Sequence, residues 1–261
     1  MKTPRKFFER PINRGRYGQN FINPLNRNPR RSFSQTDEDG ITVNIIERLA
    51  LSSDSSFLEI GVGNGLENNT LILATLGWSG IWIGNEDLDP DLHLPNDVLF
   101  KKQHIDKGDI ELSLLDSLSD DSQKIPELVS VDIDSIDYYI VEEMLRNQIK
   151  PKIFIVEYNG TFIPPIKYVV NYESNLSWKL DSKYGASLTA WVNLFETHDY
   201  RLVACSISGI NAFFVSNSVS GFFKDIPNDI NEIYKSPNYF AQPNRGWDMS
   251  IDSINLLLKR D

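Results

Sequence analysis

Residues Phe57-Leu-Glu-Ile-Gly-Val-Gly-Asn-Gly65 decide the fold of this chain. The first five form a short, mostly apolar run that ends in glycine, which predicts a buried parallel strand. The three alternating glycines predict a tight turn, because glycine adopts backbone conformations that other residues avoid. The following segment, up to Gly77, predicts a helix, whose N-terminus would favour electronegative groups beside the turn.

Further strands and helices alternate along the chain on either side of this unit. Short apolar runs predict strands at 80–84, 97–102, 127–134 and 152–159, and helical spacing of apolar residues predicts helices within 34–53, 135–149 and 184–200. Two more runs, 200–209 and 211–217, read as a hairpin around Gly209, Ile210 and Asn211. This order predicts an α/β fold: a Rossmann-like, doubly wound, mostly parallel seven-stranded sheet with helices on both faces and a C-terminal antiparallel hairpin.

The chain divides by composition into three parts. Residues 1–33 are rich in Asn, Pro, Gly and Arg and predict an extended or partly disordered arm. Residues 34–220 hold the predicted Rossmann-like domain, and residues 221–261 are a weakly patterned extension that we expect to pack on it. At 261 residues the chain can bury a sizeable core without disulfides or a structural metal.

Charge separates the arm from the rest of the chain. Residues 1–33 carry nine Lys or Arg and one Glu, a net charge of +8. Because the whole chain has a net charge of −10, residues 34–261 have a net charge of −18. An acidic body repels nucleic acid and anionic membranes, and only the basic arm could attract them. The arm could equally be a solvated tail or a strap on its own acidic body.

Cysteine content and hydropathy bear on the location of the protein. The single cysteine, Cys205, cannot form an intramolecular disulfide, which favours a reducing compartment. No run of about 18 apolar residues is present, and the N-terminal residues lack the apolar centre of a signal peptide. We therefore expect a cytoplasmic protein without a membrane span. The oligomeric state is left open.

The glycine turn predicts a ligand site. The dinucleotide fingerprint would require glycine at position 66, where this chain has Leu66, so the pattern is an acidic residue followed by three alternating glycines. Glu59, at the end of the strand, and the turn glycines Gly61, Gly63 and Gly65 are the candidate binding residues. A structural glycine turn without a ligand is the alternative.

Polar residues follow the next two predicted strands as well. Open α/β sheets bind ligands outside the carboxyl ends of their strands, so these positions face the expected site. Glu86 could accept hydrogen bonds from a ribose diol, and Asp106 could reach an adenine amino group. An acidic surface turn is the alternative interpretation of Glu86.

The last two parallel strands also end in polar residues. Asp132, Asp134, Glu157 and Asn159 are expected at one rim of the sheet, and residues 132 and 134 would share a face of a strand. Converging carboxylates can raise one another's pKa or bind Mg²⁺ or Mn²⁺, and both suit deprotonation of a hydroxyl group. Asp134 or Asp137 could instead cap the following helix.

Taken in order, these segments resemble the FkbM-like methyltransferases and their relatives. The resemblance spans roughly residues 34–216 and rests on several motifs: Ser34-Gln-Thr-Asp-Glu-Asp-Gly40, Phe57–Gly65 with Glu67-Asn-Asn-Thr70, Gly77-Trp-Ser-Gly-Ile-Trp-Ile83, Val131-Asp-Ile-Asp134, Ile155-Val-Glu-Tyr-Asn159, Tyr184-Gly-Ala-Ser187 and Asn211-Ala-Phe-Phe214. It implies a Rossmann-like methyltransferase fold with S-adenosylmethionine against Glu59, Gly61, Gly63 and Gly65.

The expected function is therefore S-adenosylmethionine-dependent O-methylation of a sugar or another small hydroxylated metabolite. Asp132 or Asp134 would act as base or bind Mg²⁺ or Mn²⁺, and Glu157 and Asn159 would orient the acceptor. Two alternatives stay open: a divalent-metal-dependent sugar-nucleotide transferase and a non-catalytic methyltransferase-like binding protein. Gly84, where relatives often carry an acidic residue, favours the second of these.

Overall fold

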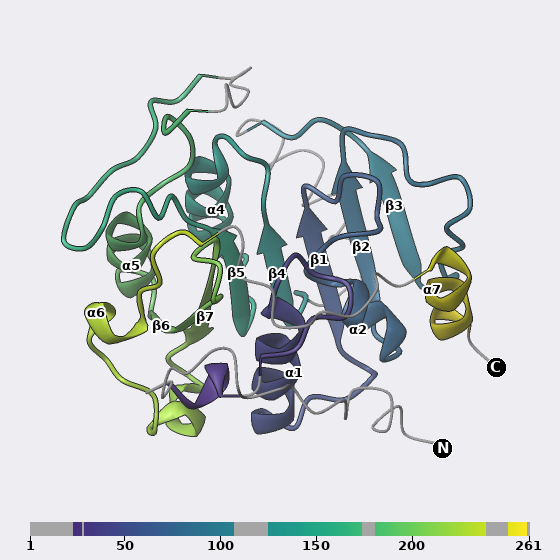
Figure 1. Ribbon diagram of the computed structural model, residues 1–261, viewed down its shortest axis with the longest axis horizontal. Coiled ribbons are helices and arrows are strands. Elements are labelled where there is room, and N and C mark those ends of the chain that lie inside the picture. The colour runs from purple at the N-terminus through teal and green to yellow at the C-terminus, as the bar shows by residue number, and fades with distance from the viewer. Residues whose placement is uncertain (1–22, 28, 107–124, 174–180, 239–249, 260–261) are drawn as a thin grey trace.

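The computed structural model describes residues 23–27, 29–106, 125–173, 181–238 and 250–259. These residues form one seven-stranded sheet with helices and loops around it (Figure 1). Its strands are β1 (Ser56–Ile60), β2 (Ser79–Gly84), β3 (Val98–Lys102), β4 (Leu128–Val131), β5 (Ile153–Glu157), β6 (Tyr200–Cys205) and β7 (Asn211–Ser216). The strand order is β3-β2-β1-β4-β5-β7-β6. Strands β1 to β5 pair in parallel, whereas β7 runs antiparallel to both β5 and β6. The predicted Rossmann-like fold with its C-terminal hairpin is confirmed.

Helices connect and cover the strands. They are α1 (Glu38–Arg48), α2 (Leu71–Thr75), α4 (Asp137–Arg146), α5 (Leu188–Glu196), α6 (Ile230–Ile233) and α7 (Ile251–Leu258), with short 3-10 turns η2 (Pro24–Asn26) and η4 (Ser220–Phe223). Along the strand order, the connection from β1 to β2 runs in one direction and the connection from β4 to β5 runs in the opposite direction. Because crossovers between parallel strands are right-handed, α2 and α4 cover opposite faces of the sheet. Within the described parts of the chain, no helix has the length and apolar character needed to cross a bilayer.

The core lies on both faces of the central strands. Every residue of β4 and of β5 is buried, which explains why these segments read as continuous apolar runs. Phe195 of α5 bridges β5 and β7, with its ring 5.2 Å from that of Phe154 and 4.1 Å from that of Phe214. Burial of each such ring contributes roughly 1.5–3 kcal/mol, so this cluster holds α5 firmly against the sheet.

Part of the basic arm packs on the domain. Asn23 donates from Nδ2 to the carbonyl oxygen of Val203 at 2.6 Å, and Asn26 donates to that of Cys205 at 2.9 Å. Leu25 between them is fully buried, and the turn η2 contacts both α1 and β6. Residues 23–27 therefore form a strap along the edge strand of the sheet. Residues 1–22 and 28 of the predicted arm lie outside the described residues.

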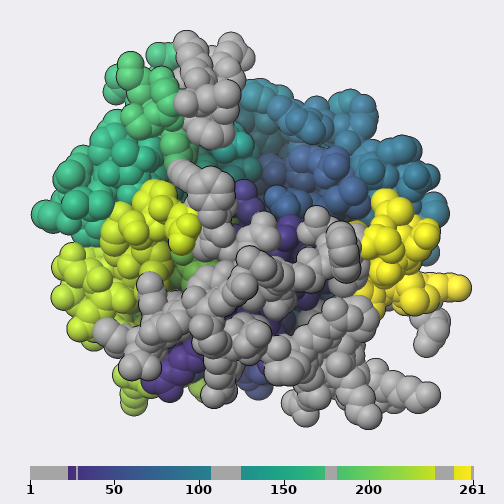
Figure 2. All heavy atoms as spheres, in the orientation of Figure 1, coloured from purple at the N-terminus to yellow at the C-terminus, as the bar shows by residue number. Residues whose placement is uncertain are grey.

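The C-terminal part of the chain contacts two separate regions of the domain. Figure 2 shows α7, in yellow, at the surface beside the blue residues that precede β3. Its Asn255 accepts a hydrogen bond from the backbone N–H of His93 at 2.8 Å and donates to the carbonyl oxygen of Asp91 at 2.7 Å. Near α6, Tyr158 donates its hydroxyl to the carbonyl oxygen of Lys235 at 2.6 Å. The C-terminal part of the chain thus contacts the domain at two places, before β3 and beyond the end of β5.

Candidate functional site

A cavity of about 290 Å³ opens at the carboxyl ends of β1, β4 and β5. It lies where the strand order reverses between β1 and β4, the position at which open α/β sheets bind ligands. Five of its lining residues are acidic: Glu59, Glu67, Asp132, Asp134 and Glu157. The others are Gln35, Gly61, Asn68, Asn69, Tyr184, Ile210 and Asn211. Five of the ten residues predicted from the sequence, namely Glu59, Gly61, Asp132, Asp134 and Glu157, thus line one cavity.

Strand register places three polar side chains in a row across the sheet. Val131 of β4 pairs with Val156 of β5, so the next residues, Asp132 and Glu157, are neighbours. In the antiparallel pairing, Glu157 stands opposite Asn211, the first residue of β7. Residues opposite each other in a sheet project to the same face. The cavity floor is therefore built by the ends of two parallel strands and the beginning of an antiparallel one.

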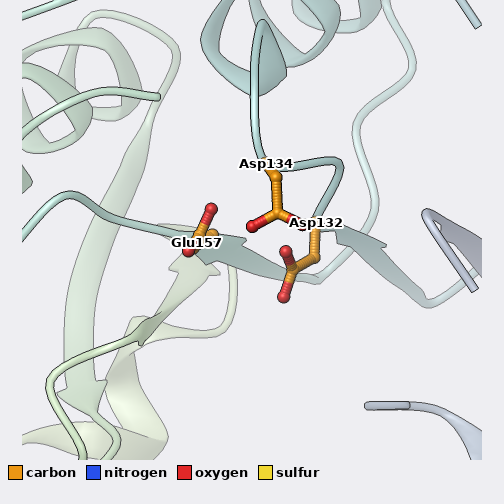
Figure 3. Close-up of side chains that lie close together, drawn as sticks. All are labelled: Asp132, Asp134 and Glu157. Carbon is orange, nitrogen blue, oxygen red and sulfur yellow. The ribbon is translucent and has the colours of Figure 1, made fainter. Parts of the chain in front are cut away.

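Asp132, Asp134 and Glu157 converge in the cavity (Figure 3). One carboxylate oxygen from each lies within 4.8 Å of the other two. The convergence does not arise from strand alternation, as the sequence suggested, because β4 already ends at Val131. Instead Asp134 has a φ of 56°, a left-handed conformation that turns the chain back and directs its carboxylate toward the other two. Asp and Asn enter this conformation more readily than most residues.

The electrostatics of this cluster are those of like charges held close together: Glu157 is buried, Asp132 is half-buried and Asp134 is exposed. Burial raises the pKa of Glu157 well above its usual range, and the neighbouring carboxylates of Asp132, Asp137 and Asp134 raise it further. Burial also raises the pKa of Asp132 well above its usual range, and the nearby carboxylates of Asp137, Asp134, Glu59 and Glu38 raise it further. None of the described residues that line the cavity is Lys or Arg. The cavity therefore suits a ligand that brings positive charge or hydrogen-bond donors.

Asp137 braces the turn that carries Asp134. Its Oδ1 accepts a hydrogen bond from the backbone N–H of Ile133 at 2.7 Å, and its Oδ2 accepts one from Ser135 at 3.0 Å. The side chain is fully buried, and burial raises its pKa to about 6. The expected capping of α4 by Asp134 or Asp137 is not found, because the helix begins at Asp137 after Ile136, with no side-chain cap; Asp137 instead fixes the backbone on both sides of Asp134.

Glu59 uses both carboxylate oxygens inside the protein. Oε1 accepts from the backbone N–H of Asn69 at 2.8 Å, and Oε2 accepts from that of Thr70 at 3.0 Å and from the Thr70 hydroxyl. Trp82 of β2 donates its indole N–H to the same hydroxyl at 2.8 Å. Burial raises the pKa of Glu59 to about 7. Glu59 lines the cavity, but its hydrogen bonds hold the start of α2.

The three glycines of the turn are required for different reasons. All have positive φ: 101° at Gly61, 56° at Gly63 and 85° at Gly65. A Cβ atom on Gly61 would lie 1.6 Å from the backbone oxygen of Asp132, and one on Gly65 would lie 2.8 Å from Leu92. One on Gly63 would meet nothing within 4 Å. Packing alone therefore explains the glycines at 61 and 65, whereas Gly63 borders open space.

The remaining predicted residues do not line this cavity. Glu86 is exposed after β2, and Asp106 accepts a hydrogen bond from the Tyr172 hydroxyl at 2.6 Å. Asn159 is fully buried and donates from Nδ2 to the carbonyl oxygens of Ser182 at 2.9 Å and of Tyr184 at 3.0 Å. Asn159 therefore acts on the cavity through the backbone of Tyr184. The roles predicted for Glu86 and Asp106 stay predictions.

Several cavity residues were not singled out from the sequence. The sequence carries no separate signal for Asn211, because its importance depends on β7 beginning beside the end of β5. Gln35 reaches the cavity because the segment before α1 is folded against the domain: Asp39 accepts hydrogen bonds from the backbone N–H groups of Ser32, Phe33 and Ser34 at 2.6, 2.7 and 3.0 Å. The only sequence signal for Gln35 is its place within the quoted acidic motif at 34–40.

Comparisons with known proteins give distant structural similarity. No family model matches the chain, and no curated protein matches it in sequence. A candidate hemolysin from Lactococcus lactis has 12% identity and a TM-score of 0.43, with 67% of this chain and 84% of that one covered. Precorrin-6y C5,15-methyltransferase from Geobacter metallireducens has 12% identity and a TM-score of 0.39, with 72% and 92% covered. A SAM-dependent methyltransferase from Geobacter sulfurreducens, in complex with S-adenosyl-L-homocysteine, has 15% identity and a TM-score of 0.38, with 67% and 68% covered.

Proposed function

We propose that this protein is an S-adenosylmethionine-dependent O-methyltransferase that acts on a sugar or another small hydroxylated metabolite. One observation carries the proposal: the glycine turn after β1 and the converging carboxylates after β4 and β5 border the same cavity. A methyl donor held by the turn and an acceptor held by the carboxylates would then be neighbours. Holding two reactants in line supplies a large share of the catalysis in such reactions.

The residues around the glycine turn fit this cofactor. Asn68 is buried and lines the cavity, and its Nδ2 has no hydrogen-bond partner among the described residues. It is a donor available for the carboxylate of the methionine part of the cofactor. The open space at Gly63 allows a ligand to approach the backbone. The acidic lining favours the positively charged sulfur and amino group of S-adenosylmethionine.

The carboxylate cluster supplies the groups that an acceptor hydroxyl needs. When bound, S-adenosylmethionine supplies a methyl group on a positively charged sulfur. Glu157 has an Oε2 atom without a hydrogen-bond partner among the described residues, so it is available to an acceptor hydroxyl, either directly or through a bound cation. Asp132 or Asp134 then takes the proton as the acceptor oxygen becomes the nucleophile. The raised pKa of both groups makes them stronger bases than ordinary aspartates.

The first test is cofactor binding, measured as the thermal midpoint of the purified chain with S-adenosylmethionine or S-adenosylhomocysteine. A ligand at about 100 times its Kd adds roughly 2.7 kcal/mol, which corresponds to several degrees for a domain of this size. Asn68→Ala should reduce the shift, whereas Asp54→Asn, an exposed acid before β1, should leave it unchanged. The absence of a shift with either adenosyl compound would contradict the proposal.

The second test is turnover. Production of S-adenosylhomocysteine is followed with a panel of saccharides and other hydroxylated metabolites. The double variant Asp132→Asn, Asp134→Asn should lose at least about 100-fold in rate, the lower end of what general bases contribute, while it keeps the cofactor-induced thermal shift. Asn is chosen at 134 because it tolerates the left-handed backbone there. Full activity of the double variant would remove the proposed mechanism.

The two alternatives give different results in the same assays. A sugar-nucleotide transferase would be stabilised by a UDP-sugar with Mn²⁺ and not by the adenosyl compounds. A non-catalytic binding protein would respond to the adenosyl compounds but produce no S-adenosylhomocysteine with any acceptor. A partner held through the basic arm would be lost on deletion of residues 1–33.

A further inference from the structure

The cavity contains more hydrogen-bond acceptors than the protein satisfies. Oδ1 of Asn211 and Oε2 of Glu157 are both buried and have no hydrogen-bond partner among the described residues. Asn211 is 3% exposed and Glu157 is 9% exposed, so bulk water reaches neither side chain freely. A buried polar atom without a partner costs roughly 1–3 kcal/mol. Both residues line the same cavity, so a ligand bound there is placed to supply the missing partners.

These two acceptors belong to the carboxylate cluster by strand pairing. Glu157 and Asn211 stand opposite each other across β5 and β7, so their side chains lie together on one face. Asp132 follows the β4 residue that pairs with Val156, which places it on the other side of Glu157. Asp134 completes the set, since its carboxylate oxygen lies within 4.8 Å of those of Asp132 and Glu157. Three carboxylates therefore converge, and Asn211 stands beside Glu157 by strand pairing.

The chemistry of the four groups is uniform. Three carboxylates and one amide carbonyl are hard oxygen ligands, the kind that Mg²⁺, Mn²⁺ and Ca²⁺ prefer, whereas Zn²⁺ in proteins is most often held by His and Cys. None of the described lining residues is Lys or Arg, and Arg31 pairs with Glu67 at 3.2 Å, so no lining residue supplies a counter-charge to the three converging carboxylates. A single carboxylate would be satisfied by water, but three within 4.8 Å repel one another at any pH at which they ionise.

The backbone around the cluster is held in place independently of any ligand. Asp137 fixes the turn through the N–H groups of Ile133 and Ser135. The N–H of Asp132 donates to the carbonyl oxygen of Ile60 at 3.0 Å, which ties the cluster to β1. Metal sites depend on such outer contacts to orient their ligands. The turn at Asp134 is therefore preorganised.

From these observations we propose that Asp132, Asp134, Glu157 and the side-chain oxygen of Asn211 bind one divalent cation of the Mg²⁺ and Mn²⁺ class. The cation neutralises the cluster and satisfies both unpartnered acceptors. Its remaining coordination positions are open to water or to an oxygen of the bound acceptor. This last role rests on the proposed function, whereas cation binding stands on the geometry of the four residues.

The experiment is a Mn²⁺ titration of the full chain after treatment with a chelator and dialysis, with free Mn²⁺ followed by its electron paramagnetic resonance signal. We expect one saturable Mn²⁺ per chain, displaced by excess Mg²⁺. Asp132→Asn and Glu157→Gln should each weaken binding at least tenfold, and Asn211→Ala should weaken it several-fold. Asp54→Asn removes an exposed acid from the opposite edge of the sheet and should leave the affinity unchanged.

A gain-of-function variant guards against loss of binding by misfolding. Asn211→Asp adds a fourth carboxylate, so it should lower the thermal midpoint in chelator and bind Mn²⁺ more tightly than the wild-type chain. No saturable Mn²⁺, or equal affinity in the wild-type chain and in folded Asp132→Asn and Glu157→Gln variants, would overturn the proposal. Such a result alongside a thermal shift with S-adenosylmethionine in chelator would leave the methyltransferase proposal standing. Mn²⁺ binding without a thermal shift from S-adenosylmethionine would support the cation site and contradict the methyltransferase proposal.

Discussion

Glu157, the last residue of β5, stands directly opposite Asn211, the first residue of β7. A parallel strand delivers its C-terminal residue to the ligand-binding edge of an α/β sheet, and an antiparallel neighbour delivers its N-terminal residue to the same edge. The hairpin therefore contributes to the cavity from the opposite direction of the chain. Nearby Ile210, which also lines the cavity, accepts a hydrogen bond from the N–H of Tyr158 at 2.8 Å through its carbonyl oxygen.

The glycine turn offers a matched pair of substitutions. Gly61→Ala should prevent folding or lower the unfolding free energy by more than about 4 kcal/mol, because the new Cβ would lie 1.6 Å from a backbone oxygen. Gly63→Ala should cost only about 1–2 kcal/mol, the strain of a left-handed backbone, because no atom lies within 4 Å of the new methyl group. Chemical denaturation measures both values.

The same pair separates packing from ligand binding. Folded Gly63→Ala should show a reduced thermal shift with S-adenosylmethionine, since the methyl group occupies the space that the cofactor would approach. If Gly63→Ala kept the full shift, the ligand would not reach this glycine. If Gly61→Ala were as stable as the wild-type chain, the close contact between the β1 and β4 loops would be contradicted.

Asp39 holds the segment before α1. Its Oδ2 accepts hydrogen bonds from three consecutive backbone N–H groups, those of residues 32–34. Asp39→Ala leaves these groups without an acceptor, so we expect a loss of about 3 kcal/mol or more at roughly 1–3 kcal/mol for each buried group. The thermal midpoint should fall by about 10 °C. Asp39→Asn keeps an acceptor oxygen and should lose less unfolding free energy than Asp39→Ala. Equal losses in the two variants would show that the three hydrogen bonds do not account for the stabilisation by Asp39.

Stability should fall as the pH rises toward neutrality. Burial raises the pKa of Asp37 to about 7, with Glu38 adding to the shift, and burial raises that of Asp39 to about 6 and that of Glu59 to about 7. The unfolded chain has ordinary values near 4. Each protonated group therefore stabilises the fold fully below about pH 4 and loses this contribution as the pH rises through the folded-state pKa. Urea unfolding in chelator should show a decline of a few kcal/mol from pH 5 to pH 8.

Two variants check the origin of this pH dependence. Asp37→Asn removes one raised group and should make the decline smaller. Asp225→Asn is the control, because its hydrogen bonds to the Arg48 guanidinium lower the pKa of Asp225, so this group stays ionised throughout the range. The control should therefore shift stability equally at every pH. A stability that rises from pH 5 to pH 8 would contradict the assignment.

Asn159 should behave as a positioning residue. Asn159→Ala removes the donors to the carbonyl oxygens of Ser182 and Tyr184 and should cost about 1–3 kcal/mol of stability. Asn159 acts on the cavity through the backbone of Tyr184 and not through the glycine turn. The KM for the acceptor should therefore rise, while the thermal shift induced by the cofactor stays unchanged. A lost cofactor shift with an unchanged KM would refute this role.

The fold was predictable because its signals are local. Each buried parallel strand is a short apolar run bounded by turn residues, and the hairpin is marked by Gly209 and Asn211 at the turn. The order of the strands, with its reversal between β1 and β4, is known only from the structure. A strap on the domain was one alternative for the arm, but the sequence does not show that residues 23–27 form it, since the contacts run from Asn23 and Asn26 to backbone atoms of β6 about 180 residues away.

The site was predictable in part. The sequence places Asp132 and Glu157 at one edge because parallel strands end together, and the structure has them in one cavity. The sequence does not show that the Glu59 carboxylate accepts hydrogen bonds from Asn69 and Thr70, because these bonds depend on the path of the loop before α2. Nor does it show the left-handed turn at Asp134, which depends on the brace from the helix that follows.

The contact between Gly61 and Asp132 sets a fixed distance inside the molecule. Backbone meets backbone there, with no side chain between to be shortened or lengthened. The distance between the glycine turn and the carboxylate turn is therefore fixed by backbone contact, and substitutions cannot change it without disrupting the sheet. Changes in the size of acceptor that the cavity admits must then come from lining side chains that can be exchanged, such as those of Tyr184 and Ile210.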